Sequence, residues 1–160
     1  MTPDAGKVSV AGLTVSRPDG WVFVAPDKSL APGTLVVLQG PHGEAAPAPA
    51  VEISRRPLSA MDQRKRPAVI LTGLVAELAQ VFEGLEGNAA PQDTQIASKP
   101  AARLDLTFSE GMPDGTSVAR AGRFYGIVAE GNLWLVRCLG PADGSAGPVF
   151  DQIVSSIGID

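Results

Sequence analysis

Two neighbouring segments near the end of the chain are apolar on both faces of a strand. Residues 116–129 and 132–139 flank Glu130-Gly131, a pair suited to a tight hairpin turn. The apolar residues fall on opposite faces, Phe124 and Val128 against Tyr125 and Ile127, then Trp134 and Val136 against Leu133 and Leu135. A strand that is apolar on both faces is covered on both faces. The chain is therefore predicted to build a sheet with helices on both sides.

Turn residues and alternating apolar positions predict shorter strands elsewhere in the chain. A turn at Pro18-Asp19-Gly20 separates two of them, since proline presets its own backbone angle and glycine accepts a positive one. The predicted strands cover residues 8–10, 13–15, 21–25, 34–39, 51–54 and 103–108. Residues 1–7 are expected to be a flexible N-terminus, and residues 40–50, rich in Gly, Ala and Pro, a mobile surface loop.

Two helices are predicted from apolar residues at helical spacing. The longer runs from Pro67, a residue suited to the first helical position, to Leu85, with Gly84 or Gly87 as its end. The shorter follows Pro148. Their apolar positions are Leu71, Leu74, Val75, Leu78, Val81, Phe82 and Leu85, and then Phe150, Ile153, Val154 and Ile157. No repeat or change of composition divides the chain, so a single domain over residues 1–160 is expected.

Three motifs, taken with this order of elements, are similar to the PsbP/Mog-like fold. Residues 13–21 (LTVSRPDGW) resemble its opening strand and Pro-x-x-Trp turn, and residues 122–136 resemble its long central hairpin. Residues 150–157 (FDQIVSSI) resemble its closing helix, so that the likeness spans about residues 8 to 158. The resemblance implies an α+β fold, an α/β/α sandwich in which helices cover both faces of a mostly antiparallel central sheet.

Known members of that fold are non-catalytic, and the resemblance implies a binding function. They include photosystem II extrinsic proteins, a Ran-binding nuclear import factor, DcrB-type bacterial lipoproteins and chaperones associated with type VI secretion effectors, of which the last two look closest. The implied function is a non-enzymatic bacterial protein-binding or assembly module, envelope-associated or a cytoplasmic adaptor, with a protein partner and no cofactor. One alternative is a cytoplasmic chaperone that binds apolar helices of a type VI secretion effector. A second is a small-ligand-binding protein or an enzyme with a pocket between sheet and helix.

Charge and hydropathy limit the partners and the compartment. The formal net charge of −4 weighs against a general nucleic-acid binder, which needs clustered positive charge. No apolar run reaches the roughly 18–20 residues that span a bilayer, so no transmembrane segment is expected. The protein is expected to be cytoplasmic if Met1 is its natural start, and periplasmic or lipid-anchored if an export signal has been removed. The sequence is compatible with both a monomer and a homodimer.

One histidine and one cysteine leave little room for catalytic or metal chemistry. His42 lies in the predicted mobile loop, where a solvated side chain is favoured over a base held rigidly against a nucleophile. Cys138 lies on an apolar strand and is favoured as a small buried residue over a reactive thiol. One residue of each type excludes a Cys/His zinc site, and the Asp-Gly pairs at Asp19, Asp114 and Asp143 are interpreted as turns rather than calcium loops. No catalytic residue and no metal ligand is predicted.

Two groups of charged residues are the candidate partner-binding sites. Five of the 13 basic residues lie close together in the sequence, namely Arg55, Arg56, Arg64, Lys65 and Arg66. A solvated loop before the helix is the simpler interpretation, but positive charge at a helix N-terminus opposes the helix dipole, so an anionic partner is also considered. Farther along, Arg103 and Asp105 share a strand face with Thr107. They form either a solvent-exposed face or the lining of a shallow groove.

Overall fold

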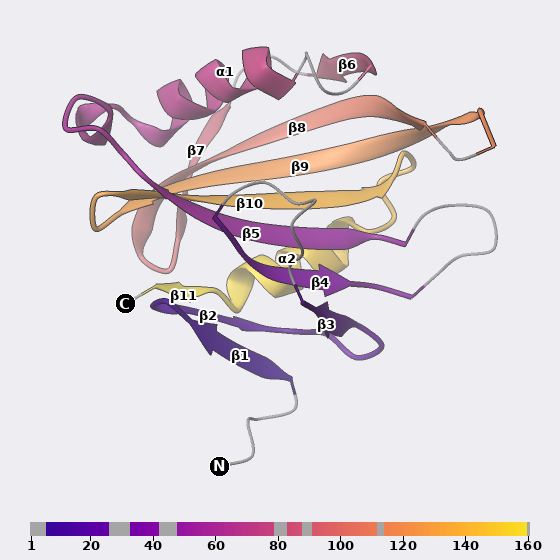
Figure 1. Cartoon of the computed structure of the whole chain (residues 1–160), viewed down its shortest axis with the longest axis horizontal. Helices are drawn as coiled ribbons and strands as arrows, with labels where there is room; N and C mark the ends of the chain where they lie inside the picture. The colour runs from indigo at the N-terminus through magenta and orange to yellow at the C-terminus, as the bar shows by residue number, and fades with distance from the viewer. Residues whose placement is uncertain are drawn as a thin grey trace.

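A computed structural model of the chain describes residues 6–25, 33–41, 48–78, 83–87, 91–111 and 114–159. These residues form a large antiparallel sheet of eight strands (Figure 1). Seven strands follow one another across it in the order β3 (Val22–Val24), β4 (Thr34–Gln39), β5 (Ala50–Pro57), β10 (Asn132–Pro141), β9 (Ser117–Ala129), β8 (Lys99–Gly111) and β6 (Glu83–Gly87). The eighth, β7 (Gln92–Ile96), pairs with the first part of β8.

The predicted hairpin of β9 and β10 lies in the interior of this sheet. Its turn is formed by Glu130 and Gly131, which both have positive φ angles of 54° and 75°. Such a turn matches the twist of the two strands, which pair from Ala129 and Asn132 onward. β8 and β5 flank the hairpin within the sheet. Both of its strands are apolar on both faces because one apolar cluster packs on each face.

Two helices cover opposite faces of the sheet (Figure 1). α1 (Pro67–Leu78) lies over β8 and β9, and its Leu71 and Leu74 are buried against Leu104, Phe124 and Leu133. α2 (Gly147–Ser155) buries Phe150 and Ile153 in a larger cluster on the other face. That cluster includes Trp21, Leu38, Ile53, Ile127, Val136 and Cys138. The predicted α/β/α sandwich with an antiparallel central sheet is confirmed.

A second, smaller sheet joins the two ends of the described chain. β2 (Leu13–Ser16) pairs with β1 (Lys7–Val10) on one side and with β11 (Gly158–Ile159) on the other. The backbone N–H of Ser16 also donates to Oγ of Ser156, at 3.0 Å. Buried residues of β2 and β11 belong to the same apolar cluster as α2, so α2 lies between the two sheets (Figure 1).

Two glycines let the helices approach the sheet closely. A Cβ atom on Gly126 of β9 would lie 3.2 Å from Leu71 of α1. A Cβ atom on Gly140 of β10 would lie 3.0 Å from the Cβ of Ala146 and 3.1 Å from the ring of Phe150. All three distances are below ordinary van der Waals contact, so a side chain at either glycine would push the neighbouring helix outward.

The prediction of a helix from Pro67 to Leu85 is wrong at its C-terminal end. α1 ends at Leu78, and the predicted end of the helix lies in β6. β6 pairs with β8, where Glu83 lies opposite Ser109. β8 is 13 residues long and offers a long edge for pairing, whereas each glycine in residues 83–87 costs a helix about 1 kcal/mol. Val81 and Phe82 lie outside the described residues.

Other boundaries also differ from the sequence prediction. Lys7 begins β1 and Ala50 begins β5, so these two residues lie in strands rather than in the predicted flexible N-terminus (1–7) and mobile loop (40–50). Residues 1–5 and 42–47, and with them His42, lie outside the described residues. The closing helix ends at Ser155, and Ile157 is buried just after it rather than within it.

Candidate functional site

A hollow of about 460 Å³ opens between the main sheet and the start of α2. We call it the sheet–helix hollow. β8, β9 and α2 each contribute to it, and the lining includes Arg103, Asp105, Thr107, Ala121, Arg123 and Phe150. The alternation of β8 places Arg103, Asp105 and Thr107 on the α2 side, because Leu104 and Leu106 point to the face covered by α1.

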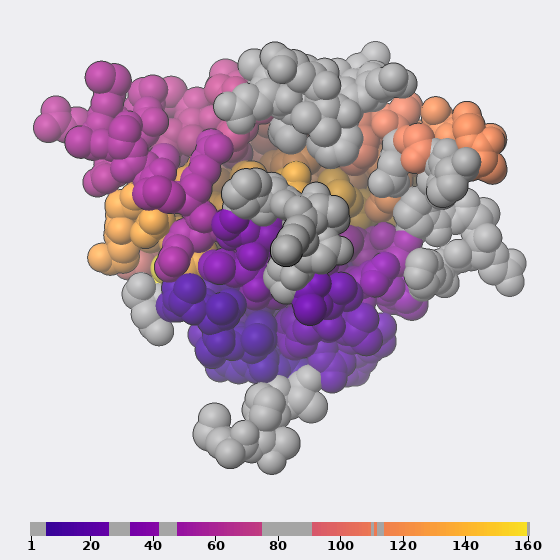
Figure 2. Space-filling view, viewed as in Figure 1, coloured from indigo at the N-terminus to yellow at the C-terminus, as the bar shows by residue number. Residues whose placement is uncertain are grey.

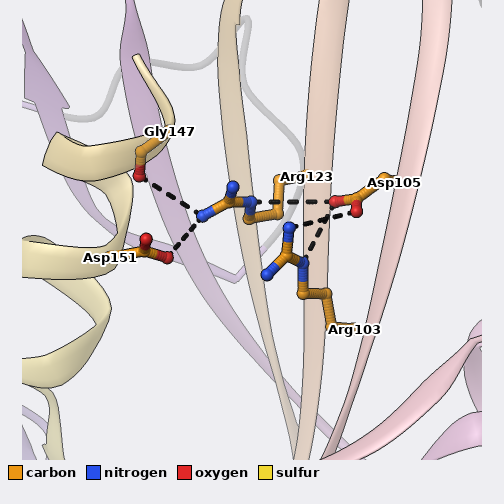
Figure 3. Close-up of polar contacts among 5 residues, drawn as sticks. All are labelled: Arg103, Asp105, Arg123, Gly147 and Asp151. Atoms are coloured by element: carbon orange, nitrogen blue, oxygen red, sulfur yellow. Dashed lines mark hydrogen bonds and ion pairs between the residues drawn. The ribbon is translucent and has the colours of Figure 1, made fainter. Parts of the chain in front are cut away.

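Four charged side chains form one network along this hollow (Figure 3). Arg103 donates two hydrogen bonds to the carboxylate of Asp105, at 3.2 and 3.1 Å. Nη1 of Arg123 donates to Asp151 on α2 at 2.6 Å and to the carbonyl of Gly147 at 3.4 Å. Nε of Arg123 lies 3.7 Å from Oδ1 of Asp105 and so connects the two pairs. The network therefore links β8, β9 and the first turns of α2.

The two arginines are held by the protein, while the two carboxylates face water. The Arg123 side chain is only 16% exposed, whereas that of Asp105 is 57% exposed. Burial alone would lower the pKa of Arg103, but the hydrogen bonds and the charge of Asp105 outweigh it and raise that pKa. Two positive and two negative charges balance, so the hollow presents fixed polar groups on an apolar surface without a net charge.

Solved structures place this architecture among known folds. No family model matches the chain, and a search of curated proteins finds no match. The chain is similar to cyanobacterial PsbP (CyanoP) from Synechocystis, with a TM-score of 0.67 and 15% identity over 96% of this chain and 91% of the other. It is also similar to the Saccharomyces cerevisiae Ran-binding protein Mog1p, with a TM-score of 0.64 and 8% identity over 96% and 94% of the two chains.

The chain has the PsbP/Mog-like fold. A third example of this likeness is LpqN of Mycobacterium tuberculosis, a protein involved in cell envelope biogenesis. The TM-score is 0.59 and the identity 14%, over 92% of this chain and 82% of LpqN. Identities this low establish the fold, and the function has to be argued from the site.

The PsbP/Mog-like sheet brings one predicted pair into a site and adds two residues to it. Arg103 and Asp105 line the sheet–helix hollow. Arg123 and Asp151 were not predicted. Arg123 lies directly opposite Asp105 across β8 and β9, so its role depends on a strand register that one sequence does not specify. Asp151 carries no sequence signal, because an exposed acidic residue is ordinary on any helix.

The structure does not bring together all five basic residues that were predicted as one group, because Arg55 and Arg56 point to opposite faces of β5. Arg55 lies over the ring of Trp134, 5.4 Å from its centroid, and donates to the carbonyl of Ala11 at 3.0 Å. Its neighbour Arg56 points to the opposite face, as successive strand residues do, and lines a second hollow with Lys65. Arg64 and Arg66 are exposed nearby.

The cysteine and two of the Asp-Gly aspartates lie in environments that fit structural roles. Cys138 is fully buried, and burial raises the pKa of its thiol to about 12, so it stays protonated. Asp114 and Asp143 accept hydrogen bonds from the backbone N–H groups of Thr116 and Ser145, which confirms their interpretation as turn residues. Within the described ranges, no group of three or more His, Cys, Asp or Glu side chains could hold a metal ion. No helix in this part of the chain is long and apolar enough to cross a membrane.

Proposed function

We propose that this protein is a non-enzymatic binding module that holds a segment of a partner protein in the sheet–helix hollow. The observation that carries the proposal is the hollow itself, a concave and mostly apolar surface with fixed polar groups at its edge. Apolar concavities with a few oriented polar groups are the usual form of binding sites. Here the orientation comes from Arg103 and Arg123, which the network already holds in place.

The chemistry at the hollow favours binding over catalysis. A covalent mechanism needs an activated nucleophile with a base within hydrogen-bonding reach. The arginine and aspartate side chains at this site are engaged with one another, and the thiol of Cys138 is protonated and buried. A small-ligand binder would use the same hollow, and the peptide selection described below distinguishes that alternative from a protein-binding module.

The size of the hollow indicates what part of a partner it accepts. A helix with its side chains is about 10–12 Å across, and a hollow of about 460 Å³ is too small for a whole helical segment. It suits one or two apolar side chains, with the partner's backbone lying over the arginines. This also accommodates the narrower hypothesis of a chaperone for apolar effector helices, in which one face of the helix is anchored. Mog1p, named as a Ran-binding protein, supports a protein partner by analogy.

A pair of matched substitutions on β9 tests the proposal. Ala121 lines the hollow, and Ala119 lies two residues earlier on the same face, exposed and outside it. Ala121→Phe fills the hollow, and Ala119→Phe adds the same ring beside it. Peptides are selected from a random display library on the wild type, and their Kd is measured on all three folded proteins. We expect Ala121→Phe to weaken binding at least about tenfold and Ala119→Phe to leave the Kd unchanged.

Two results would count against this function. One is a selection that enriches no peptide above a blank support, which would favour the small-ligand alternative. The other is a set of peptides that bind both phenylalanine variants equally well, which would place the binding surface elsewhere. Circular dichroism melts of the two variants confirm that each is folded before its Kd is compared.

A further inference from the structure

A second hollow of about 430 Å³ lies on the other face of the sheet, beside α1. The end of β5, the short 3-10 helix η1 (Asp62–Arg64) and α1 enclose it, and Figure 2 shows this segment projecting from the molecule at the upper left. The lining includes Arg56, Leu58, Asp62, Lys65, Val69 and Ile70. We call this region the α1 corner. The proposed function leaves it unused.

Hydrogen bonds fix the shape of the α1 corner. The backbone N–H of Leu58 donates to the carbonyl of Gly131 in the central hairpin turn, at 2.9 Å. Nε2 of Gln63 donates to the carbonyl of Leu58 at 3.0 Å. The hydroxyl of Ser59 accepts the backbone N–H of Asp62 at 3.1 Å. The corner is therefore a preformed surface, and little of the protein's conformational entropy would be lost when a ligand binds to it.

The α1 corner carries positive charge that opposes the charge of the rest of the chain. Residues 56–66 have a net charge of +3 in a protein whose net charge is −4. The one acidic residue, Asp62, pairs with Lys65 at 2.9 Å. The hydrogen bonds from Lys65 and Ser59, together with the charges of Lys65 and Arg56, hold the pKa of Asp62 below its usual value. Arg64 and Arg66 stay exposed at the start of α1, where they oppose the helix dipole.

Apolar side chains are exposed among these charges. Met61 is 73% and Val69 49% exposed, two of the four large apolar residues exposed in the described part of the chain. Leu58 and Ile70 are half-buried at the same hollow. A ligand that complements this surface must therefore combine negative charge with apolar groups.

The shape of the corner favours a peptide over a membrane. A helix that binds a lipid surface uses a free apolar face, but α1 buries its apolar face, with Leu71 and Leu74, against the sheet. What remains is a concave hollow with charges at its edge, which fits individual side chains. We propose that the α1 corner binds an acidic segment of a partner protein in which carboxylates alternate with apolar side chains.

The test uses a fluorescently labelled peptide in which glutamate and leucine alternate, with fluorescence anisotropy as the readout. The charge is tested with Arg56→Gln, and Lys7→Gln is its matched control, because Lys7 is another exposed strand cation and does not line the hollow. The apolar contact is tested with Val69→Ser, and Val22→Ser is its control, since Val22 is 54% exposed on β3. Neither control alters the α1 corner.

We expect the Kd to rise about threefold to tenfold for Arg56→Gln and for Val69→Ser and to stay unchanged for both controls. The Kd of the wild type should also rise with added salt, because exposed charges are screened. A lysine–leucine peptide should not bind. Ala121→Phe, on the opposite face, should leave this binding intact, so failure here and failure of the proposed function are separate outcomes.

Three results would overturn the inference. In the first, the wild type fails to bind the glutamate–leucine peptide. In the second, Arg56→Gln and Lys7→Gln bind the peptide equally well. In the third, the protein sediments with vesicles containing phosphatidylserine in an Arg56-dependent manner and ignores the peptide, which would make the corner a lipid-binding surface.

Discussion

At the scale of single residues, Cys138 shows how burial determines chemistry. It lies on β10 beneath the charged network, with Arg123 directly opposite on β9. Burial raises the pKa of its thiol from 9.0 to about 12, although Arg123 and Arg103 favour the thiolate. Desolvation outweighs these charges because the thiol has no contact with water. The residue therefore contributes packing rather than reactivity.

The reactivity of Cys138 follows directly from this environment. We expect the native protein to react with a thiol-specific reagent at least about a hundredfold more slowly than the urea-unfolded chain. Since the thiolate is the reacting form, the unfolded rate should level off above its ordinary pKa of 9.0, while the native rate should keep rising with pH past 9 because its pKa is raised to about 12. Absorbance of the released chromophore measures both rates. A native rate that levels off near pH 9, as the unfolded rate does, would contradict the raised pKa.

The alternation of β8 was predictable at this scale, and its partners were not. Leu104 and Leu106 are buried on one face, and Arg103 and Asp105 lie on the other, as the period of two requires. The sequence contains no information on which strand pairs with β8 or in which register. Arg123 could therefore not be assigned to the site before the pairing was known.

At the scale of elements, the helices pack closest to the sheet where a strand carries glycine. Gly140 of β10 lies under the start of α2, close to Ala146 and Phe150. In contrast, a Cβ atom on Gly73 of α1 would meet nothing within 4 Å. Gly140 therefore makes room for α2, whereas Gly73 makes room for nothing. An alanine substitution at each position distinguishes the two cases.

Adding a methyl group at each glycine should change stability in opposite directions. Gly140→Ala should lower the free energy of unfolding by about 1–3 kcal/mol, since the core under α2 is overpacked. Gly73→Ala should raise it by up to about 1 kcal/mol, since alanine favours an exposed helix position. Urea denaturation measures both. Equal changes for the two variants would show that α2 does not rest on Gly140.

The presence and type of the long elements could be predicted from the sequence, whereas the strands β6 and β7 could not. The hairpin of β9 and β10 and the closing helix carry strong periodic patterns. β6 was missed because the apolar spacing continues past the end of α1, and only pairing with β8 turns residues 83–87 into a strand. β7 is mostly polar, and its turn into β8 uses positive φ angles at Ala97 and Ser98 without the usual glycine.

At the scale of the whole molecule, the two hollows lie on opposite faces of the main sheet. The sheet–helix hollow is apolar and balanced in charge, whereas the α1 corner is positively charged. Different partner chemistry is expected at each. A module with two such surfaces could hold two segments at once, which is the property that an adaptor needs.

The most direct test of the central claim is a nuclear magnetic resonance map of where a selected peptide binds. A peptide from the display selection is titrated into the isotope-labelled protein, and backbone amide shifts are followed. We expect shifts concentrated in residues 103–107, 121–123 and 144–151, with residues 56–74 unchanged and the shifts lost in Ala121→Phe. Shifts that lie on the α1 face instead, or that persist in Ala121→Phe, would contradict it.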